Sequence, residues 1–229
     1  MSILININNL EYSYADNSSF GMTIKSFNFK KGERLLIYGE SGLGKSTFLN
    51  LISGAIQPKE GKIEILGKDI SHMSSYAKDK IRGDHFGIVF QTFNLLPYIS
   101  VEKNILMGLV FSKRKKDKVH NISNAIKNLM KNLSLDYDEL KNRNSYELSI
   151  GQQQRVAVAR ALIGNPEIIL ADEPTSALDM ENQKLFLDLL FESMDKKEQG
   201  LVLVSHKKDI SKNFTTVKNI NDICELKNV

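Results

Sequence analysis

The segment around residue 40 constrains the fold more than any other part of the sequence. An apolar run, Arg34–Tyr38, leads into Gly39-Glu-Ser-Gly-Leu-Gly44-Lys45-Ser46, and a segment expected to be helical, Thr47–Ser53, follows. This order fits the pattern G-x-x-x-x-G-K-[ST] between a strand and a helix. It predicts an α/β fold in which a strand ends at a glycine-rich loop and the loop opens a helix.

The residue types in this loop match what phosphate binding requires. Glycines let consecutive backbone N–H groups surround phosphate oxygens, and the N-terminus of the following helix adds its dipole. Lys45 would reach the β- and γ-phosphates, and the Ser46 hydroxyl would ligate Mg²⁺. By itself the pattern indicates nucleoside triphosphate binding, which kinases, GTPases, helicases and transporters share. The residues predicted to contact the nucleotide here are Gly39, Ser41, Gly42, Gly44, Lys45, Ser46 and Thr47.

A second motif supplies carboxylates. The apolar run Ile168–Ala171 ends in Asp172 and Glu173. This order places both side chains at the carboxyl edge of a strand, beside the phosphate loop. Asp172 would hold Mg²⁺ directly or through water. Glu173 would orient or deprotonate the attacking water, and such general base catalysis contributes about 10²–10⁴-fold in rate.

Other parts of the chain support the α/β reading. Short β-branched runs alternate with helical stretches, and several runs are apolar throughout, which is typical of strands covered on both faces of a parallel sheet. The predicted strands are Ile3–Ile7, Thr23–Phe29, Arg34–Tyr38, Lys62–Leu66, Phe86–Phe90, Glu167–Ala171 and Leu201–Ser205.

The middle of the chain has a different pattern. Residues 119–133 place apolar side chains at helical spacing, and no strand is expected between Gln91 and Asn165. We therefore predict one domain over residues 1–229, with an α/β core at about 1–90 and 165–229 and a helical subdomain at about 91–164. The basic run Lys113–Lys116 reads as a solvated loop tip, with a lipid-headgroup contact as the alternative.

Composition limits the class of protein. The chain has 229 residues, and 41% apolar with 25% charged residues is the balance of a soluble globular protein. The single cysteine, Cys224, cannot form an internal disulfide, which favours a reducing cytosol. No apolar run approaches the length that spans a bilayer, and no secretory signal opens the chain. A net charge of +4 is too small to indicate nucleic acid as a partner.

Further segments, in order, resemble one family. Residues 148–155, Leu-Ser-Ile-Gly-Gln-Gln-Gln-Arg, resemble the LSGGQ-x-QR signature of ABC ATPases. Gln91 follows an apolar strand where that family has its Q-loop, and His206 follows another where it has its switch histidine. Ser176–Asp179 is similar to the family's D-loop. The resemblance extends from about Asn9 to His206 and implies a P-loop NTPase (RecA-like) core with the inserted helical subdomain of ABC type.

The resemblance also implies a mechanism. In this family two ATPase domains sandwich two ATP molecules, and each phosphate loop faces the signature of the other subunit. Ser149, Gly151 and Gln152 would then contact the nucleotide of a partner copy. The catalytic residues implied are Lys45, Gln91, Glu173 and His206, and the Mg²⁺ ligands implied are Ser46, Gln91 and Asp172.

Tyr14 resembles the aromatic residue that stacks on adenine in this family, although Tyr12 and Tyr14 could equally be ordinary strand aromatics. The sequence departs from the family pattern twice. Ile150 replaces the usual first glycine of the signature, and Lys207 replaces the aspartate that often follows the switch histidine. Neither departure removes a predicted catalytic group.

Within the family, residues 86–105 most resemble the small ATPases of lipoprotein release, macrolide export and the FtsE type. This implies an ATPase on the cytoplasmic face of the cell membrane, bound to an integral membrane permease and paired as a homodimer or with another ATPase, with no nucleic acid partner. The alternatives are the ATPase subunit of an importer, a soluble ABC ATPase acting on DNA or the ribosome, and a nucleotide-gated scaffold. The sequence does not identify the transported substrate.

An apolar cluster follows Gln91. It contains Phe93, Leu95, Leu96, Pro97 and Tyr98, and its proline interrupts any helix. These side chains could fill the core of the helical subdomain. The hypothesis drawn here is that at least one of Phe93, Leu96 and Tyr98 is exposed and receives a short helix from the membrane subunit.

Overall fold

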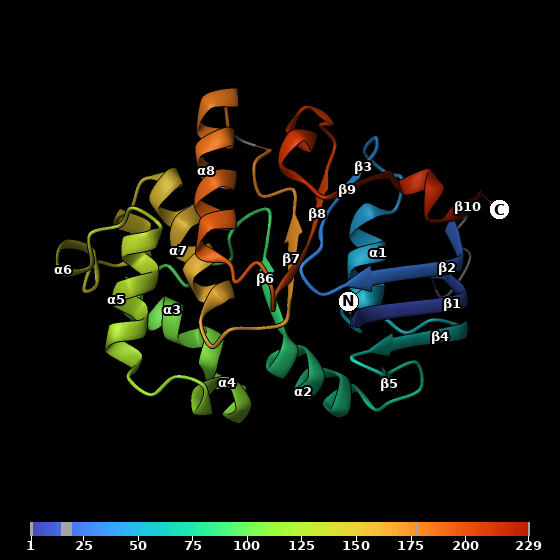
Figure 1. The fold of residues 1–229 in the computed structure, drawn as a ribbon, viewed down its shortest axis with the longest axis horizontal. Coiled ribbons are helices and arrows are strands. Elements are labelled where there is room, and N and C mark those ends of the chain that lie inside the picture. Colours follow the sequence, from blue (N-terminus) through green and yellow to red (C-terminus); the bar gives the residue numbers. More distant parts are fainter. Residues whose placement is uncertain (1, 15–19, 177, 229) are drawn as a thin grey trace. The chain divides into compact units, whose positions relative to one another are not determined.

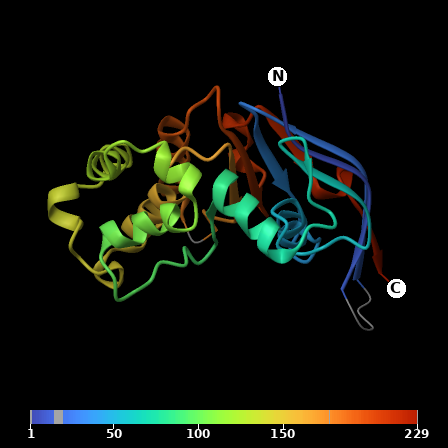
Figure 2. The same cartoon turned by 90° about the horizontal axis from the view of Figure 1, so that it is seen from below.

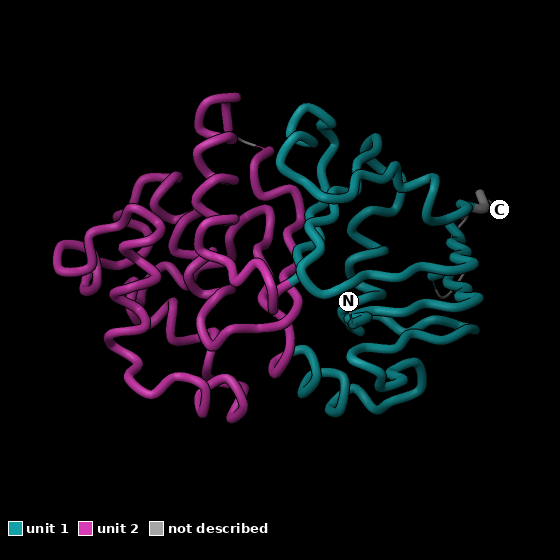
Figure 3. The backbone as a smooth tube through the Cα atoms, in the orientation of Figure 1, with its two compact units in different colours: residues 1–82, 200–229 teal, residues 83–199 magenta. Residues whose placement is uncertain are grey.

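The computed structural model describes residues 2–14, 20–176 and 178–228. The chain divides into two compact units, and Figure 3 colours them separately. The first unit comprises residues 1–82 and 200–229, and the second comprises residues 83–199. Each unit is described by itself below.

The first unit contains a five-stranded antiparallel sheet, which Figures 1 and 2 show from two directions. Its strand order is β10-β2-β1-β4-β5, and its long strands β1 and β2 pair from Ile3↔Lys30 to Ser13↔Gly21. Alternate side chains along β2 are buried, which is typical of a sheet with one covered face. The strands are β1 (Ile3–Ser13), β2 (Phe20–Lys30), β4 (Glu60–Ile65), β5 (Lys68–Asp69) and β10 (Glu225–Asn228).

The same unit also contains parallel strands. β3 (Arg34–Tyr38) pairs in parallel with β8 (Gly200–Ser205) and with β9 (Thr216–Asn219). Every residue of β8 is buried, as its uniformly apolar sequence predicts. Helix α1 (Lys45–Ile52) packs against the antiparallel sheet, where the ring of Phe48 meets Phe27 edge-on at 5.1 Å between centroids. The remaining elements are α2 (Ser75–His85), whose last turn enters the second unit, and the 3-10 turns η2 (Asp209–Asn213) and η3 (Ile220–Asp222).

The second unit combines helices with two strands. β6 (Phe86–Val89) and β7 (Ile168–Asp172) pair in parallel, and between them the chain forms helices α3 to α7. Helix α7 lies at the centre of this packing, and its residues Val156–Ala159 are all buried. The helices are α3 (Val101–Val110), α4 (Lys113–Asp117), α5 (Ile122–Asn132), α6 (Tyr137–Leu140), α7 (Ile150–Leu162), α8 (Met180–Ser193) and the 3-10 turn η1 (Ser145–Glu147).

Most predicted elements are present. Each predicted strand coincides with or overlaps an observed strand, and the helix expected within residues 119–133 is α5. Between Gln91 and Asn165, where every residue is described, the structure has no β-strand beyond a single bridge between Ser100 and Asn144. The division of the domain at residues 91 and 164 stays a prediction. In the described residues, no helix combines the length and the apolar content that crossing a bilayer requires.

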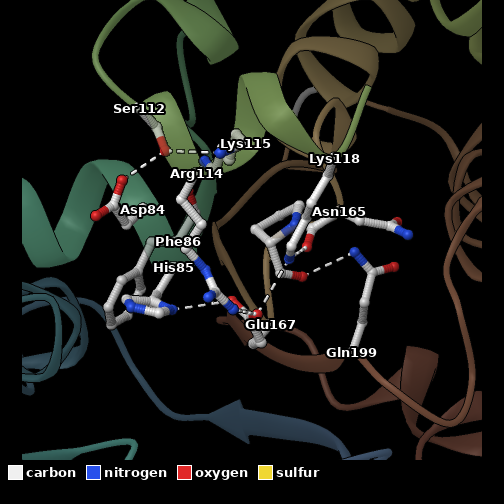
Figure 4. A network of polar contacts seen from close by, with 11 residues as sticks. Asp84, His85, Phe86, Ser112, Arg114, Lys115, Lys118, Asn165, Glu167 and Gln199 are labelled. Atoms are coloured by element: carbon white, nitrogen blue, oxygen red, sulfur yellow. Dashed lines mark hydrogen bonds and ion pairs between the residues drawn. The ribbon is translucent and has the colours of Figure 1, made fainter. Parts of the chain in front are cut away.

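The prediction of a solvated loop at Lys113–Lys116 is wrong. These residues form helix α4, which begins at the N-cap Ser112, whose hydroxyl accepts a hydrogen bond from the backbone N–H of Lys115. The side chain of Lys115 is buried, and its ammonium donates to the carbonyl oxygen of Phe86 at 2.6 Å. Figure 4 shows this lysine beside a cluster of charged side chains around Glu167. Lys115 therefore belongs to a buried polar network, whereas Lys113, Arg114 and Lys116 are exposed.

Candidate nucleotide-binding site

The phosphate loop connects β3 to α1 inside the first unit. Gly42 and Gly44 adopt left-handed backbone conformations, with φ of 83° and 77°. A Cβ atom on Gly44 would also lie 2.6 Å from Cε of Met22 and 3.1 Å from the ring of Phe20. Gly44 is therefore required both by its conformation and by the sheet behind it.

Helix α1 begins where an anion would bind. Its N-cap is Gly44, so no side chain caps the first N–H groups, and its first turn has no acidic residue. Uncapped N–H groups at a helix N-terminus form a site for phosphate oxygens. The loop therefore fits the triphosphate that its sequence predicts.

Lys45 is the first residue of α1 and is only 5% exposed. Its ammonium donates to the carbonyl oxygens of Gly39 and Glu40, at 2.8 Å each. These bonds close the loop and keep the positive charge at the loop rather than in solvent. Ser46 beside it is exposed and thus accessible to a metal ion that accompanies a nucleotide.

The ring of Tyr14 lies next to this helix. Its hydroxyl and Oγ1 of Thr47 are 3.0 Å apart, and the rings of Tyr12 and Phe20 pack against it at 5.1 and 5.7 Å. Even so, Tyr14 remains 45% exposed, whereas Tyr12 is buried. An exposed ring fixed beside the phosphate loop suits a stacking surface for a nucleobase.

His206 follows β8 at the same edge of the parallel strands. Tyr38 is the register partner of Ser205, and the backbone N–H of Gly39 donates to the carbonyl oxygen of Ser205 at 3.3 Å. The first unit therefore brings His206 next to the start of the phosphate loop, and the histidine side chain is exposed.

The second unit places Gln91 and the two predicted carboxylates at the same edge of a pair of parallel strands. β6 and β7 run in parallel with Val89 opposite Ala171, so Gln91 and the carboxylates Asp172 and Glu173 follow at one edge. Gln91 is exposed and both carboxylates are half-buried. Glu173 has a φ of 43°, a conformation that residues with a Cβ adopt at a cost and that is often found at active sites.

Two glutamines that were not predicted as site residues hold the segment just after Glu173, one through a backbone carbonyl and the other through a side-chain hydroxyl. The side-chain amide of Gln154, in α7, donates to the carbonyl oxygen of Pro174 at 2.5 Å. The amide of Gln183, in α8, donates to Oγ1 of Thr175 at 2.9 Å. The available signal was a polar residue on the buried face of an otherwise apolar helix, since such a residue must find a partner.

The signature residues form the N-terminus of α7. Ser149 is the N-cap, its hydroxyl accepts from the N–H of Gln152 at 3.3 Å, and the Gln152 side chain accepts from the N–H of Ser149 at 3.0 Å. Gln152 is therefore engaged in a capping box. Open space lies in front of Gly151, and Ser149 and Gly151 border a hollow of about 420 Å³ completed by residues of α8. Ile150 is 63% exposed.

The segment similar to the D-loop ends at Asp179, which caps α8 by accepting from the N–H of Asn182 at 2.9 Å. Its residue Ala177 lies outside the described residues. The predicted site residues are thus distributed over both units. The first unit holds the phosphate loop, Tyr14 and His206, and the second holds Gln91, the carboxylates and the signature.

A glycine loop closed by a buried lysine, between a parallel strand and an uncapped helix, defines a P-loop nucleotide-binding protein. The chain belongs to the ABC transporter family, whose profile matches residues 23–176. The predicted family, fold and activity are confirmed: this is an ATP-binding and ATP-hydrolysing subunit of the ABC transporter type.

Curated relatives agree with this assignment. The ABC transporter ATP-binding protein YtrE of Bacillus subtilis is 39% identical over 191 residues, which are 81% of this chain and 78% of YtrE. The macrolide export ATP-binding/permease protein MacB of Pasteurella multocida is 37% identical over 221 residues, 96% of this chain and 33% of MacB. The chain therefore spans about a third of the length of MacB.

Solved structures are similar over nearly the whole chain. The dimeric structure of MJ0796, a bacterial ABC transporter cassette, has a TM-score of 0.78 and 33% identity and covers 95% of both chains. The dimeric MJ0796 structure of a post-hydrolysis state bound to ADP and Pi also has a TM-score of 0.78, with 32% identity over 94% of both chains.

Proposed function

We propose that two copies of this chain clamp ATP between them and drive a membrane permease. The observation that carries the proposal is that the chain has two separate helix N-termini suited to bind phosphate oxygens. One is at the phosphate loop of the first unit, and the other is the exposed N-terminus of α7 at Ser149 and Gly151. Two such N-termini on one chain suit a pair of copies, in which the signature of each closes on the nucleotide of the other. The dimeric form of MJ0796 supports the same arrangement.

The chemistry follows from the residues at hand. Mg²⁺, when bound with ATP, neutralises charge on the phosphates, and Ser46, Gln91 and Asp172 would hold it. Lys45 binds the β- and γ-phosphates through its ammonium. Glu173 orients and deprotonates the attacking water, and His206 holds the γ-phosphate in line with that water. Tyr14 stacks on the adenine ring.

The permease docks on the segment Thr92–Ser100, which we name the docking segment. Leu96 and Tyr98 in this segment are 46% and 85% exposed, as the sequence-based hypothesis requires. The ring of Tyr98 lies 6.2 Å from that of Tyr146, which is itself 57% exposed. Exposed aromatic and aliphatic side chains next to Gln91 form a surface on which a short amphipathic helix can bury its apolar face.

Binding to a membrane permease would place the protein at the cytoplasmic face of the cell membrane. The similarity to MacB, which combines an ATP-binding part with a permease, favours export or release of a macrolide-like drug, peptide or lipoprotein.

The test of the paired mechanism is the variant Glu173→Gln. The amide cannot accept the proton of the attacking water, so ATP stays bound and holds two chains together. Size-exclusion chromatography is expected to show a dimer with MgATP and a monomer without nucleotide. A Ser149→Arg change in the same background should abolish the dimer, because the bulky cation blocks the N-terminus of α7. A Glu173→Gln variant that binds ATP and remains monomeric would contradict the proposal.

A further inference from the structure

The docking segment begins in a backbone conformation that its own residues disfavour. Phe93 and Asn94 are consecutive left-handed residues, with φ of 59° and 48°. Neither is glycine, and although asparagine tolerates this conformation, Phe93 adopts it at a cost, so contacts from elsewhere must hold the backbone there.

Arg160 in α7 provides those contacts. One terminal nitrogen of its guanidinium donates to the carbonyl oxygen of Asn94 at 2.6 Å, and the other donates to that of Phe93 at 2.5 Å. The planar fork of the Arg160 guanidinium reaches these two neighbouring carbonyls with two separate nitrogens, which an apolar side chain at this position cannot do. The sequence separation is 66 and 67 residues, so this is a tertiary contact that fixes the local turn.

Buried polar side chains fix the later part of the docking segment. Asn104 in α3 is fully buried, and it both accepts from the N–H of Leu96 at 2.8 Å and donates to the carbonyl oxygen of Leu96 at 3.0 Å. The hydroxyl of Ser145 donates to the same carbonyl at 2.7 Å. Side-chain hydrogen bonds therefore hold the backbone of the docking segment at several points, while the side chains of Leu96 and Tyr98 remain exposed for a partner.

The helix that carries Arg160 is itself closely packed. A Cβ atom on Gly108 of α3 would lie 2.2 Å from the carbonyl oxygen of Arg160, and one on Gly87 of β6 would lie 2.1 Å from that of Ala161. The opposite end of α7 carries Ser149, and its middle carries Gln154, which holds the backbone after Glu173. One helix therefore contacts the docking segment, the signature and the loop after the predicted catalytic carboxylate.

We infer that Arg160 is a positioning residue that makes the docking segment and α7 move as one body. A partner that pushes on Leu96 and Tyr98 would thereby shift Ser149 and the backbone after Glu173. The inference rests on the proposed function, because it assumes that ATP closes two chains on Ser149. Coupling between two sites is reciprocal, so ATP-driven closure must also change the surroundings of the docking segment.

This reciprocity permits a test without the permease. Tyr98→Cys, labelled with an environment-sensitive maleimide fluorophore in the Glu173→Gln background, reports on the docking segment. The native cysteine, Cys224, is only 4% exposed, and burial raises the pKa of its thiol to about 11. The maleimide therefore reacts with the exposed cysteine at position 98 and not with Cys224. MgATP is expected to change the fluorescence of this parent. In Arg160→Met most of this change should be lost, because the contact that joins the docking segment to α7 is gone.

Two further variants and one binding measurement separate coupling from folding. Arg160→Lys keeps the charge and offers one ammonium in place of two guanidinium nitrogens, so it should retain more of the signal than Arg160→Met does. Arg114→Met removes an arginine that pairs with Glu167 instead, and it should retain the full signal. Affinity for a fluorescent ATP analogue and the MgATP-dependent dimer should be unchanged in all three.

Specific results would overturn the inference. A parent that dimerises with MgATP without any fluorescence change, or an Arg160→Met variant with the full change, would exclude coupling through Arg160. Loss of the dimer in both Arg160 variants would also overturn it, because Arg160 would then be needed for the sandwich itself. A parent that does not dimerise would instead contradict the proposed function.

Discussion

Glu167 offers a stringent test of how the second unit is held together. Its carboxylate, just before β7, is only 17% exposed and accepts hydrogen bonds from His85 at 3.0 Å, from Lys118 at 3.1 Å and from Arg114 (Figure 4). Burial alone would raise the pKa of Glu167, but the bonds from these three partners outweigh burial and lower the pKa below its usual 4.5. The cluster therefore joins the start of β6, helix α4 and the start of β7.

The change Glu167→Gln removes the charge at the centre of this cluster. A hydrogen bond to a charged group contributes about 1.5–3 kcal/mol, but Arg114 and Lys118 are partly exposed and solvent screens their share. We expect a loss of about 2 kcal/mol in the free energy of unfolding, which corresponds to about 4–8 °C in Tm for a chain of this length. Urea unfolding followed by circular dichroism at pH 7 measures this loss.

The pH dependence gives the prediction its sign. A carboxylate whose pKa is lower in the folded state stabilises the fold fully above its unfolded pKa, here 4.5, and loses that contribution as the pH falls further. The gap between parent and Glu167→Gln should therefore be constant near neutral pH and shrink below pH 4.5. Glu139→Gln, which alters an exposed pair with Arg143, is the control and should unfold like the parent. A Glu167→Gln variant as stable as that control would refute the reasoning.

Three other predictions concern single side chains. Lys45→Ala removes the charge that closes the phosphate loop, so affinity for a fluorescent ATP analogue should fall at least about tenfold and ATP turnover should be lost, and near-normal phosphate release would contradict this. Burial lowers the pKa of Lys115 to about 8, so folding stability should rise by up to about 3 kcal/mol between pH 8 and 10.5, and Lys115→Met should lack this rise in urea titrations. Tyr98→Glu should keep basal ATPase activity and thermal stability but no longer co-purify with the permease, whereas joint loss of activity and stability would show that Tyr98 belongs to the core.

Local sequence signals predicted the parts of the fold that depend on local structure. The strand before Gly39 and the strand before Asp172 were readable from uniformly apolar runs, and the position of Lys45 followed from the glycine spacing. The antiparallel pairing of β1 with β2 was not predicted, because pairing depends on partners and register rather than on either run alone. The short strands β5 and β9 are too polar and brief to leave a hydrophobic pattern.

The features that the sequence did not predict, such as the buried Lys115 and the left-handed backbone of two residues, share a physical cause. Lys115 is buried where a carbonyl oxygen 29 residues away accepts a hydrogen bond from its ammonium, and a run of basic residues in the sequence gives no sign of that. The left-handed backbone of Glu173 and Phe93 was equally invisible, since glycine is the residue whose presence announces such a conformation. In each case distant contacts override the local preference.

Helix α7 suggests how such contacts can be anticipated. Its buried face is apolar except where polar residues interrupt it, and a polar group removed from water must find a partner within the protein. Gln154 and Arg160 find theirs in backbone carbonyls that follow β7 and β6, not in other side chains. Strands are held by backbone hydrogen bonds to neighbouring strands. The loops that follow them lack these bonds, so other contacts must hold their conformation. Isolated polar residues within a buried helix therefore point to the loops whose conformation matters, and here both loops begin at predicted catalytic residues, Glu173 and Gln91.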